Sequence, residues 1–515
     1  MSTSLFDVTA QLGSKLRPTS VEGILNLTGA VLVAVVVQYV ASVFYAAYFG
    51  PLSHIPGPKL AGGSWLIKSY YQRQGTLIGW MTHLHEKYGP VVRVGPTEVS
   101  FITGESAWQD IYGFHHDASK TGKYYLKDRE FFSITPSGVW SMIAEDEANH
   151  SKERRLFSHA FSEKALREQE PLLQRYVDLL QMRLHEESES GKLLDLQKWY
   201  NYTTFDIIAD LAFGESFECL SQKSYHPMVV MTFKAAAAIS MKNIMSHFPI
   251  AARFSSLFIP QETLKKRIEF YDFTKSRVER RLAMDTARPD FTTAILKHSD
   301  TNRSLSRQKI YANMGLFMIA GSETTATMLT GTTYLLLMNP DIMQKLNAEV
   351  RGRFKSANDI TIEEVNKLPY LLAVLTEGLR MYPPVPIGFP RVVPRGGDTI
   401  SGVYVPEACK VYVSQYHANH SPRNWVDPEK FAPERWLGDE RYAGDNKANY
   451  NPFSFGPRNC LGKNLAYAEM RLILAKTVFS FDMELAPESE NWFSRNKVFS
   501  LWEKPPLMAS LTAVN

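Results

Sequence analysis

One long apolar segment, residues 308–338, sets the scale of the fold. It contains no proline, and between Lys309 and Asp341 the only charged residue is Glu323. A helix over these 31 residues would be about 45 Å long, which is enough to cross a whole domain. A helix this apolar must be buried, either in the centre of a domain or in lipid.

The ends of this segment carry the signals of a helix start and a helix stop. Ser306 or Ser304 can cap the first turn, and Pro340 lies just past the last one. Its many threonines and glycines make a second membrane span the weaker interpretation. Because an ionisable side chain without a partner nearby in the sequence is costly to bury, Glu323 is a candidate site residue.

Composition limits the class of protein. The 515 residues are 44% hydrophobic and 21% charged, as in an ordinary globular protein, and the net charge of +4 is too diluted to indicate nucleic-acid binding. Cys219, Cys409 and Cys460 are too few and too scattered for a disulfide framework or a paired-cysteine zinc site, which favours reduced thiols facing the cytosol. No Gly/Ser-rich linker divides the chain after about residue 60, so we expect one large domain.

A membrane anchor precedes this domain in our interpretation. Residues 23–58 contain no Asp, Glu, Lys or Arg, and the 25 residues 24–48 are long enough to cross a hydrocarbon core. A cleaved signal peptide is the alternative, but its apolar core would be shorter and would end at small residues, whereas this one ends with Tyr45, Tyr48 and Phe49. We therefore predict a retained transmembrane helix that crosses the membrane once.

The flanks of the anchor predict its orientation. Lys15 and Arg17 precede the span, whereas three basic residues follow it by residue 73, which favours a cytoplasmic body. Residues 54–58 (HIPGP) cannot continue a helix and form a stiff hinge. The predicted division is an N-terminal tail (1–22), a transmembrane anchor (23–50), a proline-rich hinge (51–60) and a catalytic body (61–515).

The body is predicted to be mainly α with small β-sheets. Residues 90–103 have the β-branched alternation and the Gly/Pro punctuation of a short hairpin. From residue 145 to about residue 284, apolar residues recur at three- and four-residue spacing, which indicates helices. After Pro383, short extended runs alternate with turns.

The ten residues 453–462 (FSFGPRNCLG) contain the most specific pattern. A lone cysteine such as Cys460 is more often an inert buried residue than a ligand, but its neighbours change that interpretation. Gly456 allows a tight turn, Gly462 permits close approach of the backbone to a flat ligand, and Arg458 can neutralise a carboxylate.

The residues after the cysteine predict a helix. Apolar residues recur at alternating four- and three-residue spacing from Leu461 to Phe479. The free amides and the positive dipole end at the start of such a helix would stabilise a thiolate at Cys460.

The pattern F-x-x-G-x-R-x-C-x-G, which begins at Phe453, resembles the haem-ligand loop of the cytochrome P-450 family. In that family a cysteine thiolate is the axial ligand of the iron and pushes electron density onto it, which favours cleavage of the O–O bond. The resemblance implies that Cys460 is the axial ligand of haem b (iron protoporphyrin IX). It also implies a cytochrome P-450 fold, with the haem between the central long helix and the helix of the Cys loop.

Residues 320–325 (AGSETT) resemble the central-helix motif of the same family. Gly321 leaves room against a flat cofactor, and an acid beside an alcohol can pass protons in a dry site. The alternative is that the threonines only hydrogen-bond back to the preceding turn, but the acid and the glycine favour proton delivery. The resemblance therefore implies that Glu323 and Thr324 are catalytic residues.

Three further charged residues are assigned a structural role. Glu377 and Arg380 lie one turn apart on a predicted helix, although isolated E-x-x-R pairs are usually solvated surface pairs. Residues 431–436 (FAPERW) resemble the family segment whose arginine completes a buried Glu-Arg-Arg network. The resemblance implies that Glu377, Arg380 and Arg435 support the haem loop.

Other basic residues are candidates for binding the haem propionates. His150 and Arg154 share one face of a helix predicted to begin around Asp146. The family has W-x-x-x-R here, so His replaces Trp, and a plain surface pair remains the alternative for His150. Arg391 resembles another propionate-binding arginine of the family, and Arg395 is its nearest competitor.

Residues 150–159 and 424–428 are most similar to fungal secondary-metabolism hydroxylases of this family. By the same resemblance several apolar residues would line the substrate pocket, although each alone is more often ordinary core. Together they favour a substrate of lipid, terpenoid or polyketide type. The predicted wall residues are Phe131, Phe132, Trp140, Phe233, Met241, Phe248, Phe317, Val385, Ile387 and Phe389.

The resemblance implies an NADPH- and O2-dependent monooxygenase in the endoplasmic reticulum membrane, with its catalytic domain facing the cytosol. Electrons would come from a membrane-bound NADPH-cytochrome reductase, with cytochrome b5 as a second candidate donor. A haem-thiolate isomerase or dehydratase is one alternative, but such relatives tend to lose the acid-alcohol pair that is intact at Glu323 and Thr324. A non-catalytic haem sensor is another, but it needs no proton relay.

Overall fold

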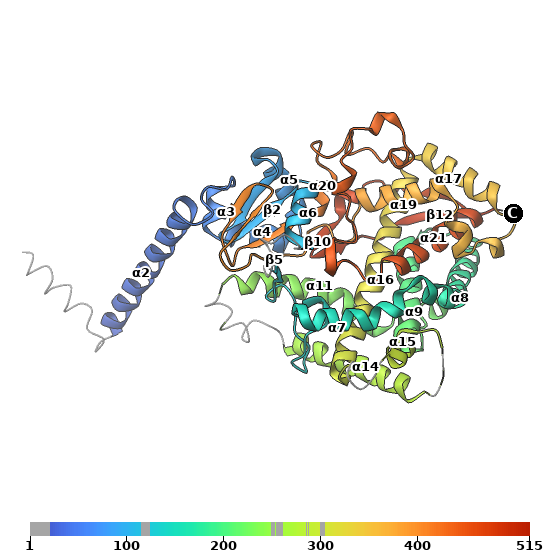
Figure 1. The fold of residues 1–515 in the computed structure, drawn as a ribbon, viewed down its shortest axis with the longest axis horizontal. Coiled ribbons are helices and arrows are strands. Elements are labelled where there is room, and N and C mark those ends of the chain that lie inside the picture. Colours follow the sequence, from blue (N-terminus) through green and yellow to red (C-terminus); the bar gives the residue numbers. More distant parts are fainter. Residues whose placement is uncertain are drawn as a thin grey trace, which may run out of the picture.

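A computed structural model shows a helical body with a long helix projecting from one side (Figure 1). The structure describes residues 21–114, 124–248, 253, 261–284, 286, 288–298 and 304–514.

The helices and strands cover most of this part of the chain. The helices are α2 (Val21–Tyr48), α3 (Lys59–Gly63), α4 (Leu66–Gln74), α5 (Leu77–Tyr88), α6 (Glu105–Tyr112), α7 (Glu147–Ser158), α8 (Glu163–Ser188), α9 (Leu196–Phe213), α10 (Cys219–Gln222), α11 (Pro227–Ser246), α14 (Gln261–Ala283), α15 (Phe291–His298), α16 (Arg307–Leu337), α17 (Pro340–Arg353), α18 (Ile362–Val365), α19 (Pro369–Met381), α20 (Gln415–Asn419) and α21 (Lys463–Ser480). The strands are β1 (Val91–Gly95), β2 (Glu98–Phe101), β3 (Leu126–Lys127), β4 (Leu194–Asp195), β5 (Arg391–Val392), β6 (Asp398–Ile400), β7 (Val403–Val405), β8 (Lys410–Val413), β9 (Phe481–Leu485), β10 (Lys497–Phe499), β11 (Leu501–Glu503) and β12 (Met508–Ala513). The prediction of a mainly α fold with small sheets is confirmed.

Helix α16 crosses the centre of the body (Figure 1). Its bounds differ by one residue at each end from the predicted segment 308–338, and the Ser306 hydroxyl caps it by accepting from the Lys309 amide at 3.3 Å. It packs against α9, α14, α19 and α21, and most of its side chains are buried. Burial within the body therefore explains the apolar composition of α16, which is not among the helices apolar enough to cross a membrane.

The largest sheet lies between helix α2 and the helical part of the body (Figure 1). Its strand order is β1-β2-β8-β5-β3, and β1 and β2 form the predicted antiparallel hairpin. Strands β3 and β5 pair antiparallel with Lys127 opposite Arg391. This register places two basic residues from distant parts of the sequence next to each other.

Helix α2 is exposed along most of its length, and its residues Gly23–Tyr48 are long and apolar enough to cross a membrane. Its last turns contact the body. The Tyr39 hydroxyl lies 2.5 Å from the Ser64 hydroxyl, and the buried Arg93 guanidinium donates to the Ala46 carbonyl at 3.0 Å. Helix α2 is thus fixed to the sheet by side-chain contacts as well as tethered by the chain.

Candidate active site

A cavity lies between α16 and the start of α21. Its volume is about 1610 Å³ when the space at its opening to solvent is included. Eight of the predicted site residues line it: His150, Arg154, Gly321, Thr324, Phe453, Arg458, Cys460 and Gly462. Three others, Glu323, Arg391 and Gly456, do not line it.

The loop that carries Cys460 is closed by its own backbone. The Cys460 amide donates to the Phe453 carbonyl at 2.8 Å. Gly456 has a φ of 72°, and a Cβ atom there would lie 1.9 Å from the Tyr112 carbonyl oxygen. A glycine is therefore required at the turn, whereas at Gly462 a Cβ would meet only ordinary contacts, 3.9 Å from Phe161 and 4.0 Å from the Cys460 sulfur.

The side chain of Cys460 is exposed to this cavity. Burial raises the pKa of its thiol, and the Gly462 amide and the Arg154 guanidinium oppose that rise only in part. The Gly462 amide acts in the direction predicted for the start of α21, but its effect on the pKa of Cys460 is smaller than that of burial. A coordinated metal deprotonates a thiol outright, so the sulfur suits a metal ligand better than a free nucleophile.

Two arginines connect the Cys loop to α7. Arg154 donates to the Asn459 carbonyl at 2.7 Å and to its side-chain oxygen at 2.5 Å. Arg458 donates to the Glu147 carboxylate at 3.0 Å and to the Glu145 carbonyl at 2.8 Å. Helix α7 begins as predicted, because the Asp146 carboxylate accepts from the Asn149 amide. These contacts hold both guanidinium groups at the cavity wall.

The cavity wall carries more cationic groups than acceptors. Arg391 is buried, its Nε has no hydrogen-bond partner in the described residues, and burial lowers its pKa to about 10. Burial, helped by Arg458, lowers the pKa of His150 to about 3, and its ring has no hydrogen-bond partner among the described side chains. Such a set fits a ligand with carboxylate groups. Haem b carries two propionates, so these residues and the cysteine opposite α16 fit haem.

The central-helix motif is split between two environments. Thr324 lines the cavity, and its hydroxyl donates back to the Ala320 carbonyl at 2.7 Å, the geometry of the alternative interpretation. Gly321 also borders the cavity, but a Cβ there would lie 2.6 Å from Ile208 of α9. Because Gly321 has no side chain, α9 can pack closely on α16 at this position.

Glu323 points away from the cavity. Its Oε1 accepts from the Lys504 ammonium group, which also donates to the Thr327 hydroxyl at 2.8 Å. Its other carboxylate oxygen has no partner among the described residues. Sequence analysis did not identify Lys504 as the partner of Glu323, because Lys504 follows β11 near the end of the chain.

A second buried acid, Glu469, was not identified from the sequence. It lies on α21, lines the cavity and has one carboxylate oxygen without a partner in the described structure. Burial raises its pKa well above the usual range, although Thr325 hydrogen-bonds to it. The signal that pointed to Glu323, an acid alone in an apolar helix, is weaker for Glu469, because α21 also carries Lys463, Arg471 and Lys476.

The structure brings Glu377, Arg380 and Arg435 together. Arg380 lies 2.8 Å and Arg435 2.9 Å from the Glu377 carboxylate, and all three side chains are fully buried. Burial alone would raise the pKa of Glu377, but the two guanidinium groups hold it below its ordinary value. Arg435 also pairs with Asp445 at 2.6 Å. This cluster joins α19 to the loop that leads to Cys460.

The predicted substrate wall is right in part. Phe317, Val385 and Phe389 line the cavity. The remaining seven do not line it: Phe131, Phe132, Trp140, Phe233, Met241, Phe248 and Ile387. Analogy located their segments but not the direction of their side chains. Phe132, for example, packs behind Phe389 at 5.9 Å between ring centroids.

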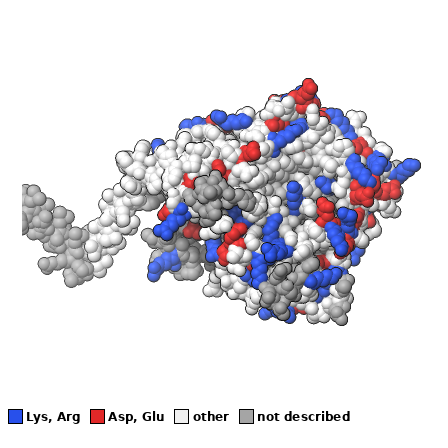
Figure 2. Space-filling model, viewed as in Figure 1, with Lys and Arg blue, Asp and Glu red and all other residues white. Residues whose placement is uncertain are grey.

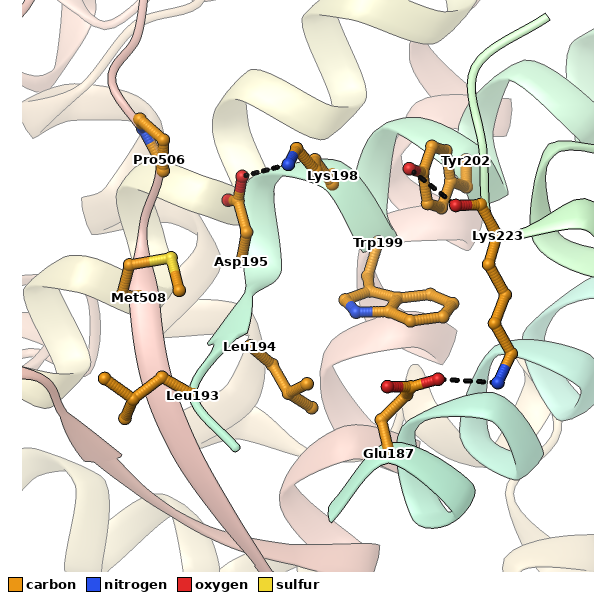
Figure 3. Close-up of a pocket in the computed structure, with 10 residues that line it drawn as sticks. All are labelled: Glu187, Leu193, Leu194, Asp195, Lys198, Trp199, Tyr202, Lys223, Pro506 and Met508. Carbon is orange, nitrogen blue, oxygen red and sulfur yellow. Dashed lines mark hydrogen bonds and ion pairs between the residues drawn. The ribbon is translucent and has the colours of Figure 1, made fainter. Parts of the chain in front are cut away.

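Elsewhere the described surface shows no comparable site. On the face in Figure 2 basic and acidic side chains are intermixed, and residues 23–48 of α2 carry no charged side chain. A shallow pocket of about 730 Å³ lies between α8, α9 and β12, where Trp199 faces the ion pair of Lys223 and Glu187 (Figure 3). It shares no lining residue with the central cavity.

The comparisons with known proteins agree with this site. The cytochrome P450 family model matches residues 56–510. Cytochrome P450 monooxygenase lcsI of Purpureocillium lilacinum is 46% identical over 472 residues, 91% of each chain. Cytochrome P450 monooxygenase traB of Penicillium crustosum is 44% identical, over 95% of this chain and 98% of its own, and efuB of Hormonema carpetanum is 43% identical, over 94% and 96%.

The chain therefore belongs to the cytochrome P450 family. It is an enzyme of the monooxygenase kind that these fungal relatives represent, and the predicted resemblance to fungal members is confirmed. Family membership implies haem iron as its cofactor, a redox partner and a small-molecule substrate.

Proposed function

We propose that the protein is a membrane-anchored haem-thiolate monooxygenase that inserts one oxygen atom from O2 into an apolar small molecule. The observation that carries this proposal is that Cys460 and Thr324 border the same cavity, from the Cys loop and from α16. Electrons come from NADPH through a separate reductase, with cytochrome b5 as a second donor. We infer that it is a biosynthetic hydroxylase of fungal secondary metabolism that acts on a terpenoid or polyketide. The fungal monooxygenase relatives support the reaction and the source of this proposal, and the apolar cavity wall supports the substrate class.

In this proposal Cys460 is the axial ligand, and iron bound to a thiolate supplies the activation of O2. Phe453, Gly456 and Gly462 shape the loop around the sulfur, and Gly321 lets the central helix pass close by. The propionate donors are His150, Arg154, Arg391 and Arg458. The buried cluster of Glu377, Arg380 and Arg435 keeps the loop in place.

Protons reach the cavity through the central helix. Thr324 is the cavity end of this path, because its hydroxyl lies at the wall and can exchange the Ala320 carbonyl for a water or a substrate group. Glu323 and Lys504 form the inner end, where a buried carboxylate and an ammonium group hold a proton within one turn of Thr324.

Membrane attachment follows from α2. Its exposed apolar surface supports a single-pass anchor in the endoplasmic reticulum with the body, residues 61–515, in the cytosol. An apolar substrate would partition into the same membrane. Phe317, Val385 and Phe389 give the cavity the apolar wall that such a substrate requires.

The test is spectroscopic and chemical. Cys460→Ala should abolish the thiolate-type absorption shift of the reduced carbon monoxide complex, and retention of that shift would show another ligand. With candidate metabolites, reductase and NADPH, the wild-type enzyme should form oxygenated products. Conversion without NADPH would instead indicate an isomerase or a dehydratase.

A matched pair of variants tests the proton path. With Thr324→Ala, NADPH consumption should continue while product falls and peroxide rises. Thr330→Ala removes a threonine of the same helix that is buried outside the cavity and should leave the ratio of product to peroxide unchanged. Equal behaviour of the two variants would remove Thr324 from the path.

A further inference from the structure

Asn313 is a fully buried polar residue near the start of α16. Asparagine is a poor helix former, and its amide is costly to bury without partners. The amide nitrogen of Asn313 donates to the Glu153 carboxylate at 2.8 Å and to the Lys309 carbonyl at 2.9 Å. The amide oxygen accepts from the backbone amide of Met142 at 2.8 Å. One side chain of the central helix therefore joins α16 to α7 and to the loop that precedes α7.

The loop that Asn313 contacts forms part of the cavity wall. Between β3 and α7, all of which the structure describes, the chain forms one 3-10 turn, Met142–Ala144. The side chains of Met142 and Ile143 line the central cavity. Because this loop has no strand pairing to fix its backbone, the positions of these two side chains depend on the contacts that other elements make with it.

Lys309 holds the same loop from one turn earlier on α16. Its ammonium group donates to the Trp140 carbonyl at 3.0 Å and pairs with the Glu145 carboxylate. It also lies 2.8 Å from the carboxylate of Glu153, which is 2% exposed. Asn313 and Lys309 thus share one buried acceptor on α7, and adjacent turns of α16 hold both ends of the segment 140–145.

We propose that Asn313 is a positioning residue for substrate binding, which keeps Met142 and Ile143 in place in the cavity wall before a ligand enters. A wall that is already ordered loses less conformational entropy on binding than a wall that the ligand must order. Asn313 does not line the cavity itself, so it acts through the loop. The inference rests on the proposed haem-thiolate function for its ligand measurements, and no sequence motif indicated this residue.

The experiment uses the full-length, haem-loaded enzyme and compares two buried asparagines. Asn313→Leu removes the amide at nearly constant side-chain volume. Asn201→Leu is the matched control, because Asn201 is also fully buried, lies on α9 against α16 and donates to the Tyr225 hydroxyl at 3.2 Å. Hydrogen exchange resolved to single amides measures the order of the loop. Absorbance titration with imidazole and with 1-dodecylimidazole measures ligand binding, because only the second ligand extends from the iron into the cavity.

In Asn313→Leu the backbone amide of Met142 should exchange about tenfold faster, because it loses its acceptor. The same variant should bind 1-dodecylimidazole about tenfold more weakly and imidazole equally well. Asn201→Leu should leave the exchange rate and both affinities unchanged. In a chain that also carries Ile143→Ala, the effect of Asn313→Leu on 1-dodecylimidazole should shrink, since both changes act on the same part of the wall.

Unchanged binding of 1-dodecylimidazole to Asn313→Leu would overturn the proposal, even if the loop exchanged faster. An equal loss of imidazole binding would also overturn it, because the change would then affect the haem itself. The thiolate-type carbon monoxide spectrum, recorded on every chain, tests the proposed function separately.

A second set of variants applies if Asn313→Leu does not fold. Asn313→Asp combined with Glu153→Gln exchanges donor and acceptor at constant charge and should bind both ligands as the wild type does. Asn313→Asp alone places two carboxylates together and should weaken the binding of 1-dodecylimidazole. In the wild-type enzyme the Met142 amide should exchange more slowly than that of the exposed Ser137, and equal rates would contradict the proposal.

Discussion

Lys504 and Glu323 form a buried ion pair that joins the segment after β11 to the centre of α16. The side chains are 1% and 9% exposed, and 181 residues separate them in the sequence. Lys504 also donates to the Thr327 hydroxyl, one turn along the helix. Glu323, the only charged residue of α16 after Lys309, is thus paired with a residue near the end of the chain.

Removing the cation alone should destabilise the enzyme strongly. In Lys504→Met the Glu323 carboxylate loses its counter-ion and remains buried, so we expect the free energy of unfolding to fall by roughly 3–5 kcal/mol. The double variant with Glu323→Gln should recover much of this loss, because no charge is then left unpaired. Denaturant unfolding of the four chains of the cycle measures both effects. Additive losses would show that the two side chains do not interact.

The turn before Cys460 can be compared with a glycine outside the site. Gly456→Ala places a Cβ atom against the Tyr112 carbonyl at a φ of 72°, whereas Gly352→Ala on α17 places one where no atom lies within 4 Å. We expect the first variant to bind little haem and to lack the thiolate-type carbon monoxide spectrum, and the second to keep both. The ratio of haem absorbance to protein absorbance measures the outcome. Equal haem content in the two variants would show that the turn tolerates a side chain.

Local patterns predicted the features that depend on neighbours in the sequence. Apolar composition and boundary signals placed α16 within one residue at each end, with Ser306 as its cap. The spacing after Cys460 predicted α21, which begins at Lys463. These features depend on helix geometry and on backbone angles, and both are encoded within a few residues.

Long-range packing decided the features that the sequence did not predict. Lys504 reaches Glu323 only because the last strands fold back over α16. Lys127 lies in the cavity wall because β3 pairs with β5, which comes more than 250 residues later. Phe132 and Trp140 were predicted to line the pocket but do not. Analogy gives the position of a segment but not the direction of each side chain.

Removing the charge of Glu377 from the buried cluster should lower the stability of the protein strongly. Glu377→Gln leaves two buried guanidinium groups, Arg380 and Arg435, without their shared carboxylate. We expect the free energy of unfolding to fall by roughly 3–5 kcal/mol, and the yield of haem-loaded protein to fall with it. Glu364→Gln, which breaks surface pairs with Arg353 and Lys367, is the control and should change stability by less than about 1 kcal/mol. Similar losses in both variants would argue against a special role for the buried cluster.

Two buried histidines should make the fold sensitive to acid. Burial lowers the pKa of His85 to about 4 and that of His417 to about 3, although each ring donates a hydrogen bond to a backbone carbonyl, His85 to that of Gly89 and His417 to that of Ile78. In the unfolded chain a histidine has a pKa of about 6.5. Below that value the unfolded state therefore binds protons that the folded state does not, and stability falls as the pH falls from 6.5 towards 4.

Each of these histidines should contribute a slope of at most about 1.4 kcal/mol per pH unit in this window. In His417→Gln the slope should be smaller by that amount, whereas His83→Gln, an exposed position on the same helix as His85, should leave it unchanged. The measurement is denaturant unfolding at a series of pH values between 7 and 4.5. The slope of His417→Gln is the decisive quantity, because a lower overall stability with the wild-type slope would mean that the folded protein already binds the proton at His417.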